Sequence, residues 1–275
     1  MTDAGIKVVT GIPTLKVHSK ICVVSRREQD KLVKYAHIGT GNFNEKTAKI
    51  YTDLSLFTKD KEITQEVYNV FDFVRFSYKR FRFNHLIVSP LNSRNKLYGL
   101  IDQEIEFVQQ GKRGDIQLKI NNLVDDGLIK RLYKASQAGV KIRIIVRGMC
   151  SLVPGVKGLS DNISIISIID RFLEHPRIMV FRNGGDRKIF ITSGDWMTRN
   201  IDNRIEVGVP IYDAQAQKMI LDILNIHFTD TLKARIIDKG QKNNYVRRGR
   251  RKKLRSQMAI YEYIKEMENP NVSEE

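Results

Sequence analysis

Apolar residues recur along this 275-residue chain with two different spacings. Short β-branched runs bounded by turn residues predict strands, whereas an apolar residue at every third or fourth position predicts a helix. The predicted strands are Val17–Ser25, Leu86–Val88, Ile116–Ile120, Ile142–Val146, Ile163–Ile169, Arg177–Phe181 and Ile189–Thr192. The predicted helices are Ile63–Phe76, Asn95–Gln110, Leu123–Ala138, Ala214–Phe228 and Arg255–Met267. Because strands and helices alternate, an α/β fold is predicted.

Three features occur in the same order in both halves, which predicts two related lobes. They are an Ala-Gly run with a following lysine (Ala4–Val9, Ala138–Ile144), a histidine with a basic residue two places on (His18, His175) and a glycine-containing turn (Ile38–Asn42, Ile191–Asp195). We place the boundary near residue 85, which gives domains 1–85 and 86–275. In the second half a strand and a helix precede the Ala-Gly run. The first lobe is therefore expected to be truncated at its N-terminus, and the chain to be part of a longer protein.

The charge balance predicts a polyanionic partner. The net charge is +16 and the sequence pI is about 9.8. Nucleic acid, a phosphate-rich ligand or an anionic membrane surface would each fit such an excess. No signal-like N-terminus and no apolar run of about 18 residues is present, so we predict a cytoplasmic protein and leave peripheral membrane association open. The two cysteines indicate neither a disulfide framework nor a metal site.

The histidine motifs are the first candidates for chemistry. On a strand, His18 and Lys20 would point to the same face. A neutral imidazole is a nucleophile towards phosphorus, and an adjacent ammonium neutralises phosphate charge. A His-x-Lys triplet alone more often contains an ordinary surface or core histidine. The counterpart at His175, followed by Arg177, indicates that two histidines converge on a cleft between the lobes.

Other residues could complete a phosphate site. The turn that contains Asn42 is rich in backbone donors, and Arg147 ends a predicted strand, where α/β folds place ligands. Arg147 could equally form a salt bridge to a helix, and Tyr51 could be a packed aromatic residue. Asp53 and Glu206 follow the two turns, and each could orient a histidine through its second nitrogen.

A block of six cations and one glycine, Arg247–Lys253, lies near the C-terminus. Such a block is usually a solvated loop. Alternatively it lines the path of a polyanion.

The repeated His-x-Lys with a following glycine-Asn turn resembles the phospholipase D superfamily. That superfamily carries an aspartate five residues after the lysine, where this chain has Ser25, and Arg177 replaces the lysine of the second copy. These departures argue against a standard phosphodiesterase site.

The chain more closely resembles the C-terminal half of the polyphosphate kinase family, over nearly its whole length. The first-domain motifs are Leu15–Lys20, Tyr35–Asn44 and Tyr51–Asp53. Those of the second domain are Asn121–Asp125, Val146–Cys150, Arg171–His175 and Asp195–Asn200. The resemblance implies two phospholipase D-like lobes.

It also implies an ATP:polyphosphate phosphotransferase. His18 would take the terminal phosphoryl group of ATP as a phosphohistidine and pass it reversibly to the end of a polyphosphate chain. Tyr51, Arg147 and His175 match nucleotide-phosphate positions of the family, and His175 could also act as acid or base. From spacing and charge we add Lys20, Arg177 and Arg199 as charge neutralisers.

The family uses Mg²⁺, with ligands expected upstream of residue 1 and none in this chain. The resemblance further implies a homo-oligomer, the upstream domains of the same enzyme as partners, and no specific nucleic acid. A phospholipase D-like phosphodiesterase or nuclease, and a non-enzymatic polyanion-binding module, stay open as alternatives. The second matters because the chain could be inactive alone.

Overall fold

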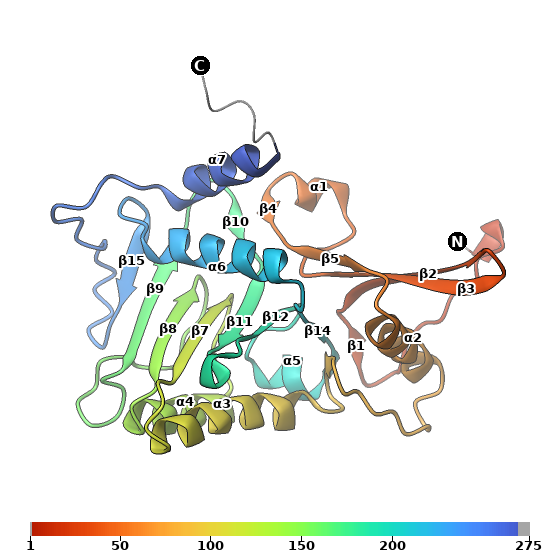
Figure 1. The fold of residues 1–275 in the computed structure, drawn as a ribbon, viewed down its shortest axis with the longest axis horizontal. Helices are drawn as coiled ribbons and strands as arrows, with labels where there is room; N and C mark the ends of the chain where they lie inside the picture. The colour runs from red at the N-terminus through yellow and green to blue at the C-terminus, as the bar shows by residue number, and fades with distance from the viewer. Residues whose placement is uncertain (1, 269–275) are drawn as a thin grey trace.

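An eight-stranded mixed sheet forms the centre of the second lobe. The computed structural model describes residues 2–268, and Figure 1 shows helices on both faces of this sheet. Its strand order is β15-β9-β8-β7-β11-β12-β14-β6, with β7, β8 and β9 parallel. The strands are β6 (Ile87–Val88), β7 (Asp115–Ile120), β8 (Lys141–Val146), β9 (Ile163–Ile168), β11 (Arg177–Phe181), β12 (Lys188–Thr192), β14 (Val207–Pro210) and β15 (Ala234–Ile237).

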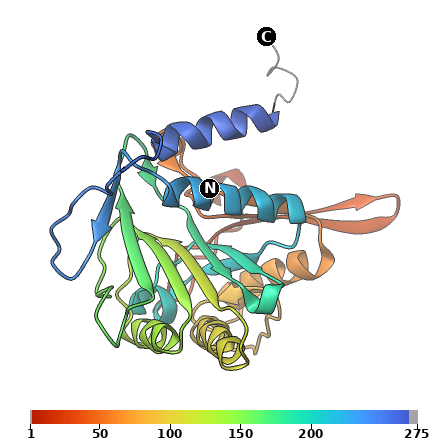
Figure 2. The same cartoon turned by 60° about the vertical axis from the view of Figure 1, so that its left-hand side comes forward.

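Helices cover this sheet because each presents an apolar stripe to it. One face carries α3 (Ser93–Gln109) and α4 (Asp126–Gln137), and the other carries α6 (Ala214–Phe228), as Figure 2 also shows. The helix α7 (Ser256–Glu268) lies over α6, and the short α5 (Thr198–Asp202) follows β12. Among residues 2–268, no helix is both long and apolar enough to cross a lipid bilayer.

The first lobe is built on a three-stranded antiparallel sheet. Its order is β2 (Lys20–Glu28), β3 (Lys31–Gly39), β5 (Ser55–Thr58), and α2 (Lys61–Arg75) packs against it. Asp60 caps α2 by accepting the N–H groups of Glu62 and Ile63. The short helix α1 (Glu45–Ala48) lies between β3 and the two-residue strand β4 (Tyr51–Thr52).

Two short parallel pairs join the lobes. The strand β1 (Lys16–Val17) of the first lobe pairs with β13 (Arg204–Ile205) of the second. Likewise β4 pairs with β10 (Leu173–Glu174). Each pair links a segment that leads into a histidine with a segment that leads into an acidic residue of the other lobe.

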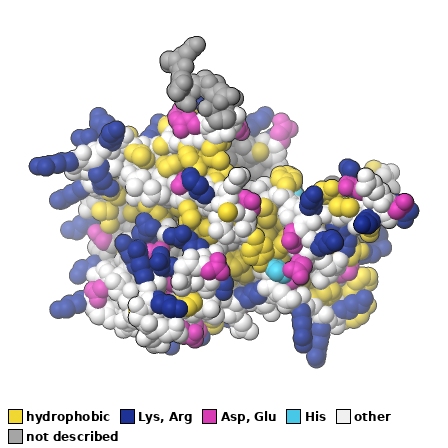
Figure 3. All heavy atoms as spheres, viewed as in Figure 1, with side chains coloured by type: hydrophobic (Ala, Val, Ile, Leu, Met, Phe, Trp, Pro, Cys, Tyr) yellow, Lys and Arg dark blue, Asp and Glu magenta, His cyan; other side chains and the backbone are white. Residues whose placement is uncertain are grey.

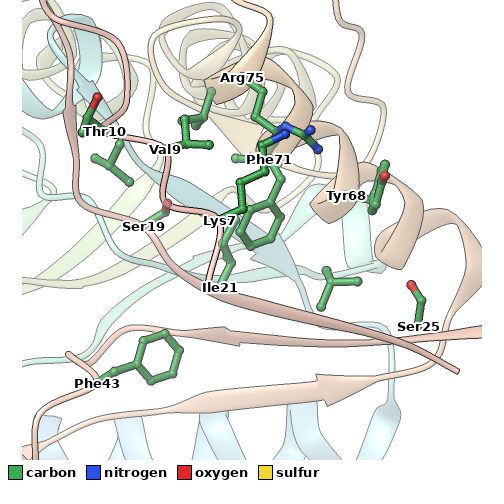
Figure 4. A pocket seen from close by; sticks show the side chains of 14 residues that line it. Lys7, Val9, Thr10, Ser19, Ile21, Ser25, Phe43, Tyr68, Phe71 and Arg75 are labelled. Carbon is green, nitrogen blue, oxygen red and sulfur yellow. The ribbon is translucent and has the colours of Figure 1, made fainter. Parts of the chain in front are cut away.

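The internal repeat is visible in the topology. The antiparallel set β2, β3, β5 followed by α2 corresponds to β11, β12, β14 followed by α6. In the second lobe β11 also pairs with β7, whereas β2 lies at the edge of its sheet. A hollow of about 740 Å³ lies there, between β2, α2 and the segment at Lys7–Thr10 (Figure 4).

The α/β class and most predicted elements are confirmed, with three differences. The predicted strand Val17–Ser25 is wrong at its start, because His18 and Ser19 leave the strand and both donate their N–H groups to the carbonyl of Ile205. The helix predicted from Leu123 begins at Asp126, because Asp125 caps it. Several elements were not predicted: the strands β3, β5, β14 and β15, the two-residue strands β4, β10 and β13, and the short helices α1 and α5.

Candidate phosphoryl-transfer site

Both histidines of the repeat lie at breaks between strands, not within strands. His18 follows β1 and precedes β2, and His175 follows β10 and precedes β11. At each break the chain leaves the pair that joins the lobes and enters the main sheet of its own lobe. The two imidazoles therefore lie where the lobes meet, as the sequence predicted, although the prediction of a strand at His18 was wrong.

The acid partners of the two histidines are exchanged between the lobes. His18 Nδ1 lies 2.9 Å from Glu206 Oε2 of the second lobe, and His175 Nδ1 lies 2.7 Å from Asp53 Oδ1 of the first. The pairing follows from the register, since Val17 lies opposite Ile205. The next residue on each side is then His18 or Glu206, and the β10·β4 register places His175 against Asp53 in the same way.

The two glycine turns hold these carboxylates in place. Thr40 Oγ1 donates to Asp53 Oδ1 at 2.6 Å, and Ser193 Oγ donates to Glu206 Oε2 at 2.5 Å. A Cβ added at Gly41 would overlap the Asp53 side chain. Sequence reasoning assigned the turns to phosphate. That assignment stays a prediction, whereas the hydroxyl groups of Thr40 and Ser193 are seen to position the acids that contact the histidines.

The hydrogen bonds differ at the second nitrogen of each ring. A carboxylate only accepts, so Nδ1 carries the proton in both histidines and Nε2 carries the lone pair. His175 Nε2 accepts from Arg177 Nη1 at 2.9 Å. Among the described residues, His18 Nε2 has no hydrogen-bond partner. Only His18 therefore presents a free lone pair to a ligand.

The basic residues of the two motifs are both buried. Lys20 Nζ donates to the carbonyl of His18 at 2.5 Å, and burial lowers the pKa of Lys20 to about 8, although Glu206 opposes this shift. Arg177 is held by Asp195 at 3.1 Å. The positive charge of the second motif is thus neutralised within the protein, whereas Lys20 has no carboxylate within ion-pair distance among residues 2–268.

Arg147 and Tyr51 reach the same place from different lobes. Arg147 Nε donates to the Glu174 carbonyl at 2.9 Å and to Asn121 Oδ1, while no carboxylate within 2–268 forms an ion pair with it. Burial and the nearby Arg177 lower the pKa of Arg147. The Tyr51 ring lies 5.0 Å from the His175 ring, centroid to centroid. The alternative of a salt bridge from Arg147 to a helix does not fit these contacts.

Two predicted residues lie apart from these contacts. Arg199 is exposed on α5, and Asn42 is exposed in its turn. Within the described chain, neither side chain has a hydrogen bond to the two histidines. Their assignment to phosphate stays a prediction.

Several site residues were missed from the sequence. Asn200 Nδ2 donates to Glu206 Oε1 at 2.6 Å, and Asn121 donates to the His175 carbonyl at 3.1 Å. Arg204 lies close enough to Lys20 to help lower the pKa of its ammonium group. The repeat could have identified Arg204, because Tyr51-Thr52-Asp53 and Arg204-Ile205-Glu206 are equivalent stretches.

A buried charged group supports the strand that leads to His175. Glu174 lies 3.0 Å from Lys119 Nζ and 3.4 Å from His227 Nε2, and it accepts from Gln257 of α7 at 2.7 Å. The neighbouring charges hold the pKa of Glu174 at about 2 despite its burial, whereas burial lowers the pKa of His227 to about 4. His227 therefore has a structural role, because it contacts Glu174, the residue that precedes His175.

A magnesium site does not fit the described residues. No group of three or more His, Cys, Asp and Glu side chains among them could hold a metal ion. The acids nearest the histidines, Asp53, Glu206 and Asp195, are each committed to a histidine or to Arg177. We therefore derive no step through a metal ion bound by this chain.

Comparisons with known proteins identify the family. Residues 1–80 match the model of polyphosphate kinase C-terminal domain 1, and residues 86–257 match that of polyphosphate kinase C-terminal domain 2. This chain belongs to the polyphosphate kinase family. The resemblance seen in the sequence motifs is thereby confirmed.

The relatives agree in sequence and in structure. A polyphosphate kinase of Vibrio parahaemolyticus is 59% identical over 268 residues, which cover 98% of this chain and 38% of the relative. The crystal structure of a polyphosphate kinase from Porphyromonas gingivalis superposes with a TM-score of 0.93 at 41% identity, over 98% of this chain and 42% of that one. A phospholipase D family member, Nuc from Salmonella typhimurium, gives a TM-score of 0.42 at 13% identity, over 56% of this chain and 97% of that one. The chain spans about two fifths of the polyphosphate kinases that it matches.

Proposed function

We propose that this chain carries the phosphoryl-transfer site of a polyphosphate kinase, with His18 as the nucleophile. The observation that carries the proposal is the difference between the two histidines at Nε2. His18 Nε2 is free and its Nδ1–H is bound by Glu206, whereas His175 Nε2 is occupied by Arg177. One histidine is thus arranged to attack, whereas both ring nitrogens of the other are engaged. His175 can bind phosphate or exchange a proton only when Arg177 releases its Nε2.

The reaction needs two displacements at one phosphorus atom. His18 Nε2 attacks the γ-phosphorus of ATP, the bond from this phosphorus to the bridging oxygen breaks, and ADP leaves with the electron pair. A terminal oxygen of polyphosphate then attacks the phosphohistidine, and the N–P bond breaks to restore the neutral imidazole. Glu206 keeps its hydrogen bond to Nδ1–H and stabilises the positive charge that develops on the ring.

The other side chains supply positive charge where phosphoryl transfer requires it. Within residues 2–268, Lys20 and Arg147 keep N–H groups without a partner near His18 and His175, and we assign them to the transferred phosphoryl group and the nucleotide phosphates. Tyr51, beside His175, would contact the nucleotide. Arg177 keeps His175 neutral and oriented, and Asn42 and Arg199 would contact more distant phosphates.

Labelling tests the proposal. With γ-labelled ATP and added magnesium, the chain should acquire label that is stable to base and labile to acid, and His18→Ala should abolish it. His37→Ala is the matched control, because His37 contacts Ser55, Phe43 and Phe57 away from the site. Equal label on His18→Ala would overturn the assignment.

A donor without a nucleotide separates the histidine chemistry from nucleotide binding. Phosphoramidate should phosphorylate His18, and ³¹P NMR should show the phosphorus on Nε2, because Glu206 occupies Nδ1. Phosphorylation at Nδ1, or no phosphohistidine from either donor, would favour the polyanion-binding module. Release of free phosphate from polyphosphate would favour a hydrolase. The homo-oligomer and the membrane association stay predictions.

A further inference from the structure

The segment after β15 concentrates positive charge at one edge of the large sheet. Residues 239–253, which we call the basic loop, contain eight Lys and Arg residues and no acidic residue. All eight are exposed. Figure 3 shows Lys and Arg side chains along the edge of the molecule at the left, where Figure 1 places β15 and this loop.

The charge of the basic loop is not balanced by the protein. None of the ion pairs among residues 2–268 includes one of the eight side chains; Asp170 binds Arg255 and Lys233, which both lie outside the loop. Arg248 and Arg251 donate to backbone carbonyls of the loop itself. A cluster of like charges without partners destabilises the folded state unless an anion binds it.

The basic loop is held against the sheet at its middle and is fixed at its C-terminal end. The N–H group of Val246 donates to the carbonyl of Ala234 at 2.9 Å, and that of Ile236 donates to the carbonyl of Asn244 at 2.8 Å. Further on, Leu254 and Thr231 exchange backbone and side-chain hydrogen bonds. Because residues 247–253 lie between these two attachments, a ligand meets cations that are already gathered, and less ordering is needed on binding.

The basic loop returns to the end of the strands at which the two histidines lie. It returns to β15 at Ala234, which pairs with Ile168 at the carboxyl end of β9. The carboxyl ends of the parallel neighbours β7 and β8 lead to Asn121 and Arg147. From β15 to β11 is four strand spacings, or about 19 Å. One extended polyanion could therefore touch both the loop and the site.

The chemistry of the basic loop favours a soluble polyanion over a membrane. Its aromatic residue, Tyr245, is held by Arg235, whose guanidinium lies 4.1 Å from the ring centroid. Val246 packs against the core. The apolar Tyr261 and Ile264 of α7 line a hollow beside Tyr51 instead of the loop. Stable membrane anchoring needs an apolar contribution in addition to basic charge, and with Tyr245 and Val246 held by the protein the loop does not supply it.

We infer that the basic loop is an exosite that holds the polyphosphate chain while its end lies at His18. The choice of polyphosphate as the polyanion rests on the proposed function. The exosite itself rests on the charge, the backbone attachments and the position of the loop. It would keep a long product bound between successive transfers.

Binding measurements test the exosite without relying on catalysis. Fluorescence anisotropy would measure the affinity of labelled long-chain polyphosphate, with tripolyphosphate as the short competitor. The exosite variant replaces Arg247, Arg250, Lys252 and Lys253 with Gln, and none of these four side chains has a hydrogen bond within the described chain. The control variant removes the same charge from the first lobe by replacing Arg27, Lys31, Lys59 and Lys61 with Gln.

The exosite variant should bind long-chain polyphosphate roughly tenfold or more weakly at about 0.1 M salt, with a shallower dependence of log K on log salt. Tripolyphosphate binding and the control variant should be unchanged. Equal losses in both variants would reduce the effect to net charge and overturn the exosite. The exosite would also be overturned if the exosite variant lost binding only to single-stranded RNA or only to anionic vesicles. If the unaltered chain binds long-chain polyphosphate through the basic loop but His18 is not labelled, the kinase assignment is refuted and the exosite remains as a polyanion site.

Discussion

Two copies of one motif have diverged here through single residues. Lys20 and Arg177 occupy equivalent positions, and so do Asn42 and Asp195. In the second lobe Asp195 fixes Arg177, which in turn occupies His175 Nε2. In the first lobe an amide stands in place of the acid. Lys20 donates to the carbonyl of His18 as Arg177 does to that of His175, but among residues 2–268 it has no carboxylate partner that would hold it like Asp195. The sequence revealed the equivalence of the histidines, but their difference depends on side-chain contacts that spacing does not determine.

The protonation of Lys20 should set the alkaline limit of His18 phosphorylation. Burial lowers the Lys20 pKa to about 8, so the ammonium that stabilises the incoming phosphate loses its charge as the pH rises through that value. The rate of phosphohistidine formation should then fall. In Lys20→Arg the charge persists, because the guanidinium pKa lies above about 12, and the alkaline fall should disappear. Labelling reactions quenched at fixed times across this pH range measure the rate for both proteins. If the alkaline fall is the same in Lys20→Arg, Lys20 is not its cause.

At the scale of elements, the sequence predicted the helices and strands that have a clear apolar periodicity. It missed strands that depend on a turn without the usual turn residues. The strand β3 follows β2 through a tight turn at Gln29 and Asp30, which have positive φ angles of 43° and 63°. Such a turn usually contains Asn-Gly or Asp-Gly, and this chain has neither there. The crossed histidine–acid pairs were equally hidden, since they depend on two-residue strands too short to leave a pattern.

The turn before Asp53 should tolerate no side chain at Gly41. A Cβ there would lie 2.8 Å from the Asp53 Cβ and overlap its carboxylate, so Gly41→Ala should displace the acid from His175. We expect phosphohistidine formation to slow about 100-fold, as small misplacements of catalytic groups do. Gly99→Ala is the control, because a Cβ at that position of α3 has open space around it. Equal rates in the two variants would show that Asp53 does not need this close packing.

At the scale of the whole molecule, the two lobes share part of their hydrophobic core. One cluster of buried residues joins Ile38 and Val67 of the first lobe to Ile178 and Val207 of the second. A second cluster lies wholly in the second lobe, between its sheet and the helices α3 and α4. The boundary near residue 85 is a prediction about sequence repeats, and the shared cluster indicates that the two lobes are one unit energetically.

Calorimetry should therefore show one unfolding transition. Ile38→Ala and Ile178→Ala remove buried side chains from the shared cluster, and each should cost about 2–5 kcal/mol and lower the same Tm by several degrees. Leu32→Ala, at an exposed position of β3, should change the stability by less than about 0.5 kcal/mol. Two transitions, each moved by only one core variant, would show that the lobes unfold separately.

The exchanged acids have a consequence for ancestry. If two identical copies of one lobe met about a twofold axis, each would lend its acid to the histidine of the other, giving the crossed arrangement of Glu206 and Asp53. In such a pair, any change in one active half would appear in both. Fusion of the copies into one polypeptide removes that constraint, so that one histidine can be freed for attack while its twin is tied to an arginine. After duplication and fusion, the two histidines are encoded separately and can acquire different roles.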